Sequence, residues 1–238
     1  DADAVFTCLP NGKIVRDAIL GDGGVAEGMS EGSVLVDMSS SAPMGTIELG
    51  KELAERGIRM VDAPVSGGVP RAIEGTIAIM VGGEKEDIEK VRPALKTMGG
   101  QIFETGGLGS AHAMKSINNV LSATNLLVGI EALVVGKKFG LDPQNMVDIL
   151  NFSSGKNSAT EGKLKEYVLS REFNSGFSMD LMIKDVATAL DLAHEMQVPW
   201  TIGSTVHEMY QSARNHLIDN ADNSEIARWI ETNGGLEL

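Results

Sequence analysis

Apolar residues follow two different periods in the first hundred or so residues of the chain. Short runs of apolar and β-branched residues, typical of buried strands, predict strands over residues 4–9, 33–38, 59–63, 76–81 and 101–104. Between them, apolar residues recur three or four positions apart and predict helices over 13–20, 42–56 and 85–98. Strands that alternate with helices are typical of parallel sheets with crossover helices.

After Gly109 the period is that of helices alone. It predicts helices over 111–138, 143–151, 158–169, 179–196, 202–217 and 224–231. Asp142 followed by Pro143 is a helix start, and Ser224 is expected to cap the last helix. We therefore predict an α/β protein with a boundary near residue 108: a doubly wound, Rossmann-type sheet domain over 1–108, then an all-α domain over 109–238.

The sheet domain is expected to be incomplete. No predicted strand leads into Gly-x-Gly-x-x-Gly with an acidic residue about 20 positions later, which is the phosphate-binding fingerprint of dinucleotide-binding domains. The glycine clusters at 21–28 and 106–109 lack that spacing. If this sheet belongs to a dinucleotide-binding domain, its first half is missing, and these 238 residues alone should bind NAD or NADP poorly and tend to aggregate.

Charge and composition exclude some partners. Lys and Arg total 20 against 33 Asp and Glu, and a net charge of −13 would repel nucleic acid and anionic membranes. The apolar stretch 117–135 contains too many polar groups for a membrane span, so we interpret it as a buried helix. The single cysteine, Cys8, falls in a run interpreted as a buried strand and favours a reducing, cytoplasmic setting.

The long helix also predicts a homo-oligomer, because it is apolar on more than one face. The alternative is a central helix covered by its own chain. The four histidines lack metal-site spacing, so no metal is expected. A serine hydrolase is not supported either, because no Gly-x-Ser-x-Gly elbow occurs.

Three segments could carry chemistry. Ser66, Gly67 and Gly68 follow a predicted strand, and a hydroxyl beside two unobstructed backbone amides could bind a carboxylate; the alternative is a simple turn. Lys115 and Asn119 share one helical face, and a lysine in apolar surroundings is suited to proton transfer; the alternative is a snorkelling lysine.

The third segment surrounds Lys184 and Asp185. Asp185 could pair with Lys184 or cap a neighbouring element. The alternative for such a Lys-Asp pair on an amphipathic helix is a solvated face.

The order and spacing of these segments resemble the β-hydroxyacid dehydrogenase family, which includes 3-hydroxyisobutyrate dehydrogenase and tartronate semialdehyde reductase. The resemblance runs along the whole chain. Its substrate-binding signature matches residues 62–75 (DAPVSGGVPRAIEG), its catalytic segment matches Lys115 and Asn119, and its C-terminal signature matches Lys184-Asp185 with Ala189 and Asp191. Leu9-Pro10 and Ser39-Ser40 look like its cofactor-contacting strand ends.

The resemblance implies hydride transfer between NAD or NADP and a small 3-hydroxy acid or its semialdehyde. It implies that Lys115 is the general acid and base, that Ser66, Gly67 and Gly68 bind the substrate carboxylate, that Asn119 orients the reacting group, and that Leu9, Pro10, Ser40 and Lys184 contact the cofactor. The alternative is a nonenzymatic relative that uses the same fold for binding or assembly.

Two departures from the family pattern stand out. Ala111 replaces the usual glycine, and roughly the first 70 residues of the pattern are absent, so the choice between NAD and NADP is not encoded in these residues.

Overall fold

The computed structural model describes residues 2–238, apart from the side chain of Pro70. The chain divides into two compact units, one reaching to Ile117 and the other beginning at Asn118. This division falls inside the long helix α5 (Ser110–Phe139), whereas the predicted boundary near residue 108 lies just before it.

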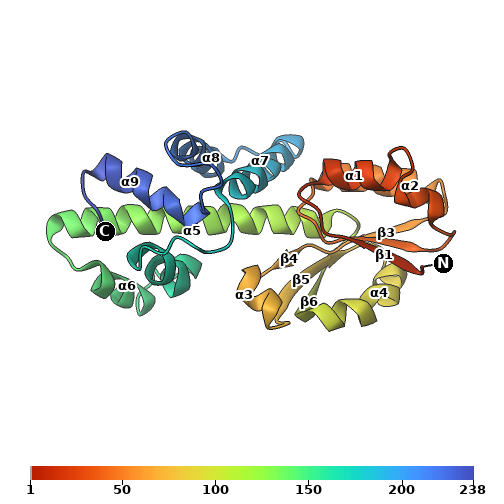
Figure 1. Cartoon of the computed structure of the whole chain (residues 1–238), viewed down its shortest axis with the longest axis horizontal. Helices are drawn as coiled ribbons and strands as arrows, with labels where there is room; N and C mark the ends of the chain where they lie inside the picture. The colour runs from red at the N-terminus through yellow and green to blue at the C-terminus, as the bar shows by residue number, and fades with distance from the viewer. Residues whose placement is uncertain (1) are drawn as a thin grey trace. The chain divides into compact units, whose positions relative to one another are not determined.

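The first unit contains a six-stranded mixed sheet (Figure 1). Its strands are β1 (Ala4–Thr7), β2 (Val34–Asp37), β3 (Arg59–Asp62), β4 (Val65–Ser66), β5 (Ile77–Gly82) and β6 (Gly99–Gly106). The order is β1-β2-β3-β5-β4, and β6 pairs with β5. All five predicted strands are present with shifted ends, while the two-residue β4 and the short helix α3 (Gly68–Ile73) were not predicted.

The expectation of an entirely parallel sheet is wrong at one place. β1, β2 and β3 are parallel, but β5 runs antiparallel to β3 and to β4, and only β6 is parallel to β5. An antiparallel neighbour needs no crossover helix on the far face. The chain therefore returns from β3 to β5 through β4 and the short helix α3.

Helices cover both faces of the sheet. Helices α1 (Gly12–Leu20) and α2 (Pro43–Ala54) pack on one face, where Leu35 and Met60 join their apolar side chains. Helix α4 (Lys85–Met98) packs on the other face against alternate strand residues such as Val36 and Val61. This alternation of inward side chains is the period of two that β-strands impose. A 3-10 turn, Val25–Gly28, completes the unit.

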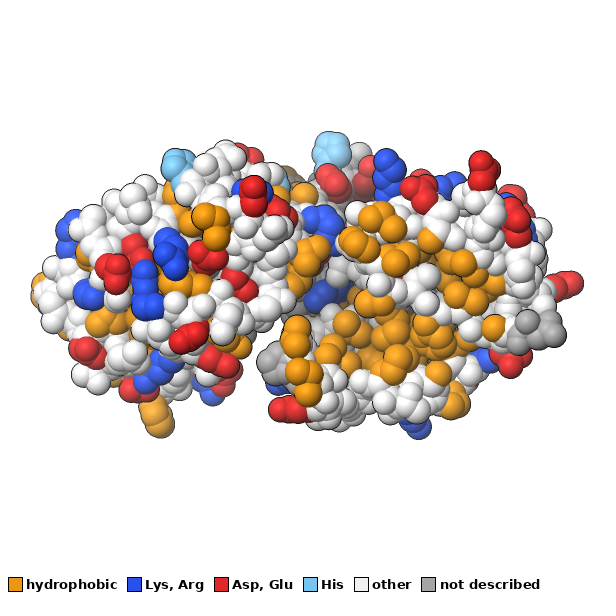
Figure 2. Space-filling view, viewed as in Figure 1, with side chains coloured by type: hydrophobic (Ala, Val, Ile, Leu, Met, Phe, Trp, Pro, Cys, Tyr) orange, Lys and Arg blue, Asp and Glu red, His pale blue; other side chains and the backbone are white. Residues whose placement is uncertain are grey.

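Strand β1 lies at the edge of the sheet, and the prediction that it is buried is wrong. It pairs with β2 alone among the described strands, its Phe6 is 38% exposed, and Cys8 just after it is exposed. Hydrophobic side chains gather on the side of this unit that Figure 2 presents. An apolar run thus marks a strand without telling whether both of its edges are paired.

The second unit is helical, as predicted. Its core forms where α5 side chains such as Leu126, Ile130 and Leu133 meet the elements that follow. These elements are α6 (Pro143–Asn151), a π-helix (Ala159–Leu169), α7 (Met179–Glu195), α8 (Thr201–Arg214), a 3-10 turn (Asn223–Glu225) and α9 (Ile226–Gly234). By length and composition α5 could cross a membrane, but 56% of its most apolar window is buried inside the protein, as in the core helix of a folded domain.

Helix ends agree with the sequence in one case and not in another. The Asp142 side chain accepts the amide of Asn145, as expected for the cap of α6. Ser224 does not cap the last helix: Asp222 makes a capping box with Glu225 in the 3-10 turn that precedes α9. The Ser224 hydroxyl instead donates to Asp222 Oδ1 at 2.6 Å, and the Ser224 amide donates to the same oxygen at 2.9 Å.

Candidate active site

Asp37, the last residue of β2, organises two loops at the carboxyl end of the sheet. Its Oδ1 accepts hydrogen bonds from the Thr7 hydroxyl (2.9 Å) and the Ser39 amide (3.0 Å), and its Oδ2 accepts one from the Ser41 hydroxyl (2.7 Å). The Ser39 hydroxyl in turn accepts the Leu9 amide at 2.9 Å. One carboxylate that is 1% exposed therefore fixes the loops that follow β1 and β2.

These loops carry three of the residues expected to contact the cofactor. Leu9 and Ser40 are half-buried, and Pro10 is exposed. Both loops follow parallel strands at the carboxyl edge of the sheet, where open α/β sheets bind their ligands.

Asp62, the last residue of β3, seats the start of α5. Its Oδ1 accepts the Gly109 amide and its Oδ2 accepts the His112 amide, each at 2.8 Å. These are two of the amides that the first turn of a helix leaves without partners. Complete burial raises the pKa of the Asp62 carboxyl, while the nearby His112 and the two amide bonds act in the opposite direction.

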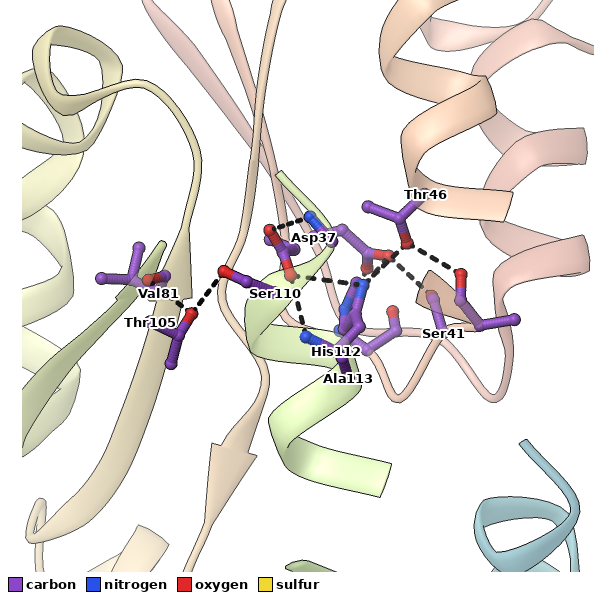
Figure 3. Close-up of polar contacts among 12 residues, drawn as sticks. Asp37, Ser41, Thr46, Val81, Thr105, Ser110, His112 and Ala113 are labelled. Atoms are coloured by element: carbon purple, nitrogen blue, oxygen red, sulfur yellow. Dashed lines mark hydrogen bonds and ion pairs between the residues drawn. The ribbon is translucent and has the colours of Figure 1, made fainter. Parts of the chain in front are cut away.

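The His112 side chain lies between α5 and the strand ends (Figure 3). Its Nδ1 shares a hydrogen bond of 2.7 Å with the Thr46 hydroxyl of α2. Its Nε2 lies 3.8 Å from Asp37 Oδ2, and its Nδ1 lies 3.8 Å from Asp62 Oδ2. The ring is buried, and its Nε2 makes no hydrogen bond within the described part of the chain.

Lys115 lies one helical turn after His112 and is half-buried. Helix α5 is continuous through Asn119, so the four-residue spacing of Lys115 and Asn119 puts both on one helical face, as the sequence predicted. The proton-transfer role of Lys115 stays a prediction.

Ser66, Gly67 and Gly68 form the turn between β4 and α3. Ser66 ends β4 and is half-buried, and both glycines are exposed. Gly67 and Gly68 have φ angles of 137° and 69°, which side chains rarely allow. A Cβ at Gly67 would also come within 2.7 Å of the Arg71 side chain. The backbone requires glycine here, and carboxylate binding by this turn stays a prediction.

In the helical unit, Asn119 and Lys184 meet at one carboxylate. The Asn119 side-chain amide donates to Asp185 Oδ2, and the Lys184 ammonium lies 2.8 Å from Asp185 Oδ1. Asp185 is 3% exposed, so the interpretation of this pair as a solvated face is wrong and the pairing of Lys184 with Asp185 is confirmed.

The roles of Asp37, Asp62 and His112 were not predicted from the sequence. The two aspartates could have been noticed, because each is the last residue of a strand and polar residues at strand ends are candidates for a functional site. No local pattern pointed to His112, because its partners lie 50 to 75 residues earlier in the chain.

Comparison with known proteins adds to this geometry. Residues 1–107 match the family model described as the NAD binding domain of 6-phosphogluconate dehydrogenase, and residues 109–230 match the one described as NAD-binding of NADP-dependent 3-hydroxyisobutyrate dehydrogenase. A 2-(hydroxymethyl)glutarate dehydrogenase of Eubacterium barkeri is 39% identical over 98% of this chain and 78% of its own length. A 3-sulfolactaldehyde reductase of Escherichia coli is 31% identical over 99% of this chain and 79% of its own length.

Solved structures agree with these sequence matches. A Mycobacterium tuberculosis 3-hydroxyisobutyrate dehydrogenase described with L-serine has a TM-score of 0.86 and is 29% identical. The match covers 97% of this chain and 80% of that one.

Proposed function

This chain belongs to the β-hydroxyacid dehydrogenase family, and on that premise we propose that Lys115 is the general acid and base of its reaction. The protein is an NAD(P)-dependent oxidoreductase that transfers hydride between the nicotinamide and a small hydroxy acid or its semialdehyde. The nicotinamide supplies or accepts the hydride when it is bound. Lys115 then protonates the developing alkoxide during reduction and takes the hydroxyl proton during oxidation.

The observation that carries this proposal is the way in which Asp62 fixes the first turn of α5. Asp62 holds the amides of Gly109 and His112, so the first turn of the helix is fixed to the end of β3. Lys115 projects from the next turn of the same helix. A proton donor must be held within hydrogen-bonding reach of its substrate, and a side chain on an anchored helix is better placed for this than one on a free loop.

The strand ends fit a nicotinamide cofactor. Asp37 fixes the loops after β1 and β2, and these loops present Leu9, Pro10 and Ser40 at the carboxyl edge of the sheet. We assign these three residues and Lys184 to cofactor contact. The Lys184 ammonium suits the anionic parts of the cofactor.

The turn after β4 supports the assignment of the substrate carboxylate. The two glycines are exposed and have positive φ angles, and they carry no side chain of their own that could cover their backbone amides. In this assignment Ser66, Gly67 and Gly68 bind the carboxylate, and Asn119 orients the reacting group.

We also assign the protein to the cytoplasm and to a homo-oligomer. Leu121, Val128 and Val135 lie seven residues apart on α5 and are 55%, 51% and 70% exposed. Large apolar side chains at this spacing form a stripe on one helical face, which favours packing against a second copy.

The test is a spectrophotometric assay of the protein expressed from its complete gene. Oxidation of C3 and C4 3-hydroxy acids should increase absorbance at the reduced-nicotinamide band with NAD or NADP. The matching alcohols without a carboxylate serve as controls and should react much more slowly. No turnover with either cofactor across the acids and semialdehydes would contradict the proposed function.

A further inference from the structure

We infer that His112 is a positioning residue, which joins the helix that carries Lys115 to the cofactor-contacting ends of β1 and β2. The inference rests on the proposed role of Lys115. His112 belongs to α5 through its backbone, while its side chain contacts α2 and faces the end of β2.

The backbone of His112 fixes one side of this junction. Its amide donates to Asp62 at 2.8 Å, so the residue sits directly at the end of β3. Lys115 follows three residues later, and a displacement of His112 therefore moves the base of the Lys115 side chain with it.

The imidazole fixes the other side. Its Nδ1 bonds to Thr46 on α2, and α2 begins directly after the loop that contains Ser39 and Ser41. Ser39 and Ser41 of that loop donate hydrogen bonds to Asp37. The Ser39 hydroxyl also accepts the Leu9 amide, which connects the same loop to the one after β1. A polar path from the proton donor to the cofactor loops thus passes through the His112 side chain.

Burial makes this junction stiff. The exposed fractions of His112, Thr46 and Asp37 are 1%, 2% and 1%. Water cannot replace a lost hydrogen bond at such a site without entering the core. If the His112 ring only filled space, an apolar ring would serve equally well and no hydrogen bond between Nδ1 and the Thr46 hydroxyl would be needed.

Two variants of His112 separate positioning from packing. His112→Phe keeps an aromatic ring, although a larger one, and removes the bond to Thr46, whereas the smaller His112→Asn keeps an amide close to the place of Nδ1. We expect His112→Phe to lower kcat by roughly 10- to 100-fold, the cost of a displacement of about 1 Å at a reacting group. KM for the hydroxy acid should change little, and His112→Asn should recover most of the lost kcat.

Thr46→Val provides the reciprocal variant. It removes the partner of Nδ1 with little change in shape, so it should reproduce the kcat loss of His112→Phe. The double variant should lose no more than either single one, because both changes break the same bond.

Ser110→Ala is the matched control. Ser110 lies in the same first turn of α5, but its hydroxyl bonds to Thr105 of β6 at 2.7 Å and not to the ends of β1 and β2. It should leave kcat unchanged. An equal loss of kcat in Ser110→Ala, or full kcat in His112→Phe, would overturn the inference.

Hydrogen exchange gives a readout that does not need turnover. In His112→Phe the amides at the start of α5 should exchange faster than in wild type, and in Ser110→Ala they should not. If wild type proves inactive on every substrate, the proposed function fails and this exchange pattern still tests the junction. Unchanged exchange in His112→Phe would overturn the junction whatever the activity.

Discussion

The carboxylate of Asp185 offers the most direct test of how the helical unit holds its functional side chains. We predict that Asp185→Ala strongly destabilises the protein. The substitution removes the acceptor of the Asn119 amide, which is buried, and the partner of the Lys184 ammonium. It should also raise KM for the cofactor, because the Lys184 side chain loses its fixed position.

The size of the effect follows from these two contacts. A buried amide hydrogen left without an acceptor costs about 1–3 kcal/mol. Loss of the bond to Lys184 adds about 1 kcal/mol. This is less than for a fully buried charged hydrogen bond, because the Lys184 side chain is 27% exposed and water can partly replace the carboxylate as its partner. The total is about 3 kcal/mol, which at roughly 3 °C per kcal/mol for a chain of this length lowers Tm by about 10 °C.

Thermal unfolding followed by circular dichroism measures this shift. Asp180→Ala is the control, because Asp180 lies on the same helix and pairs with Arg214 at 2.6 Å, but 53% of its side chain is exposed. An exposed ion pair contributes little, so Tm should barely change. The reasoning is refuted if the two variants lose the same stability, or if Asp185→Ala and Asn119→Ala prove strictly additive.

Four further predictions concern the proposed site and the surrounding fold. Lys115→Met should lower kcat by roughly 10² to 10⁴ without unfolding the protein, and near-normal kcat would remove Lys115 from the mechanism. Ser66→Ala should raise KM for hydroxy acids, and Gly67→Val should raise it further because its φ of 137° excludes valine; equal effects on uncharged alcohols would contradict the carboxylate site. Lys163→Met should raise Tm at pH 7, because burial lowers the pKa of Lys163 and its charged form therefore costs the fold stability; this gain should shrink as pH rises toward the ordinary pKa of 10.5, and a gain independent of pH would refute it. Light scattering should give a mass above that of a monomer, and Val128→Glu should reduce it; a monomeric wild type would contradict the oligomer.

The sequence predicted the kind and order of most elements because periodicity is a local property. Helix α5 was evident from its apolar spacing, and α4 was found with its observed ends. The direction of β5 was not accessible, since alternation of apolar residues is the same in parallel and antiparallel strands. The π-helix at Ala159–Leu169 was predicted only as a helix, because so short a segment does not separate the two helical periods.

The candidate site divides in the same way. Lys184 and Asp185 are adjacent, so their pairing could be predicted. The burial of Asp185 depends on α5, whose contact residue Asn119 lies 66 residues earlier in the chain. Asp62 belongs to a recognisable segment, yet its function as the acceptor for the α5 amides requires a partner 47 residues away. Such pairings are set by topology and not by neighbouring residues.

The shared helix limits how far this protein can be treated as two modules. The two family models meet near residue 108, and a cut there would appear natural for domain exchange or for recombination between relatives. After such a cut the buried Asp62 carboxylate would take both of its amide donors, now those of Gly109 and His112, from a helix that belongs to a different protein. Chimaeras should therefore keep the first turns of α5 and the sheet from the same protein. The segment exchanged as one piece at this junction then extends past residue 108 into the helix.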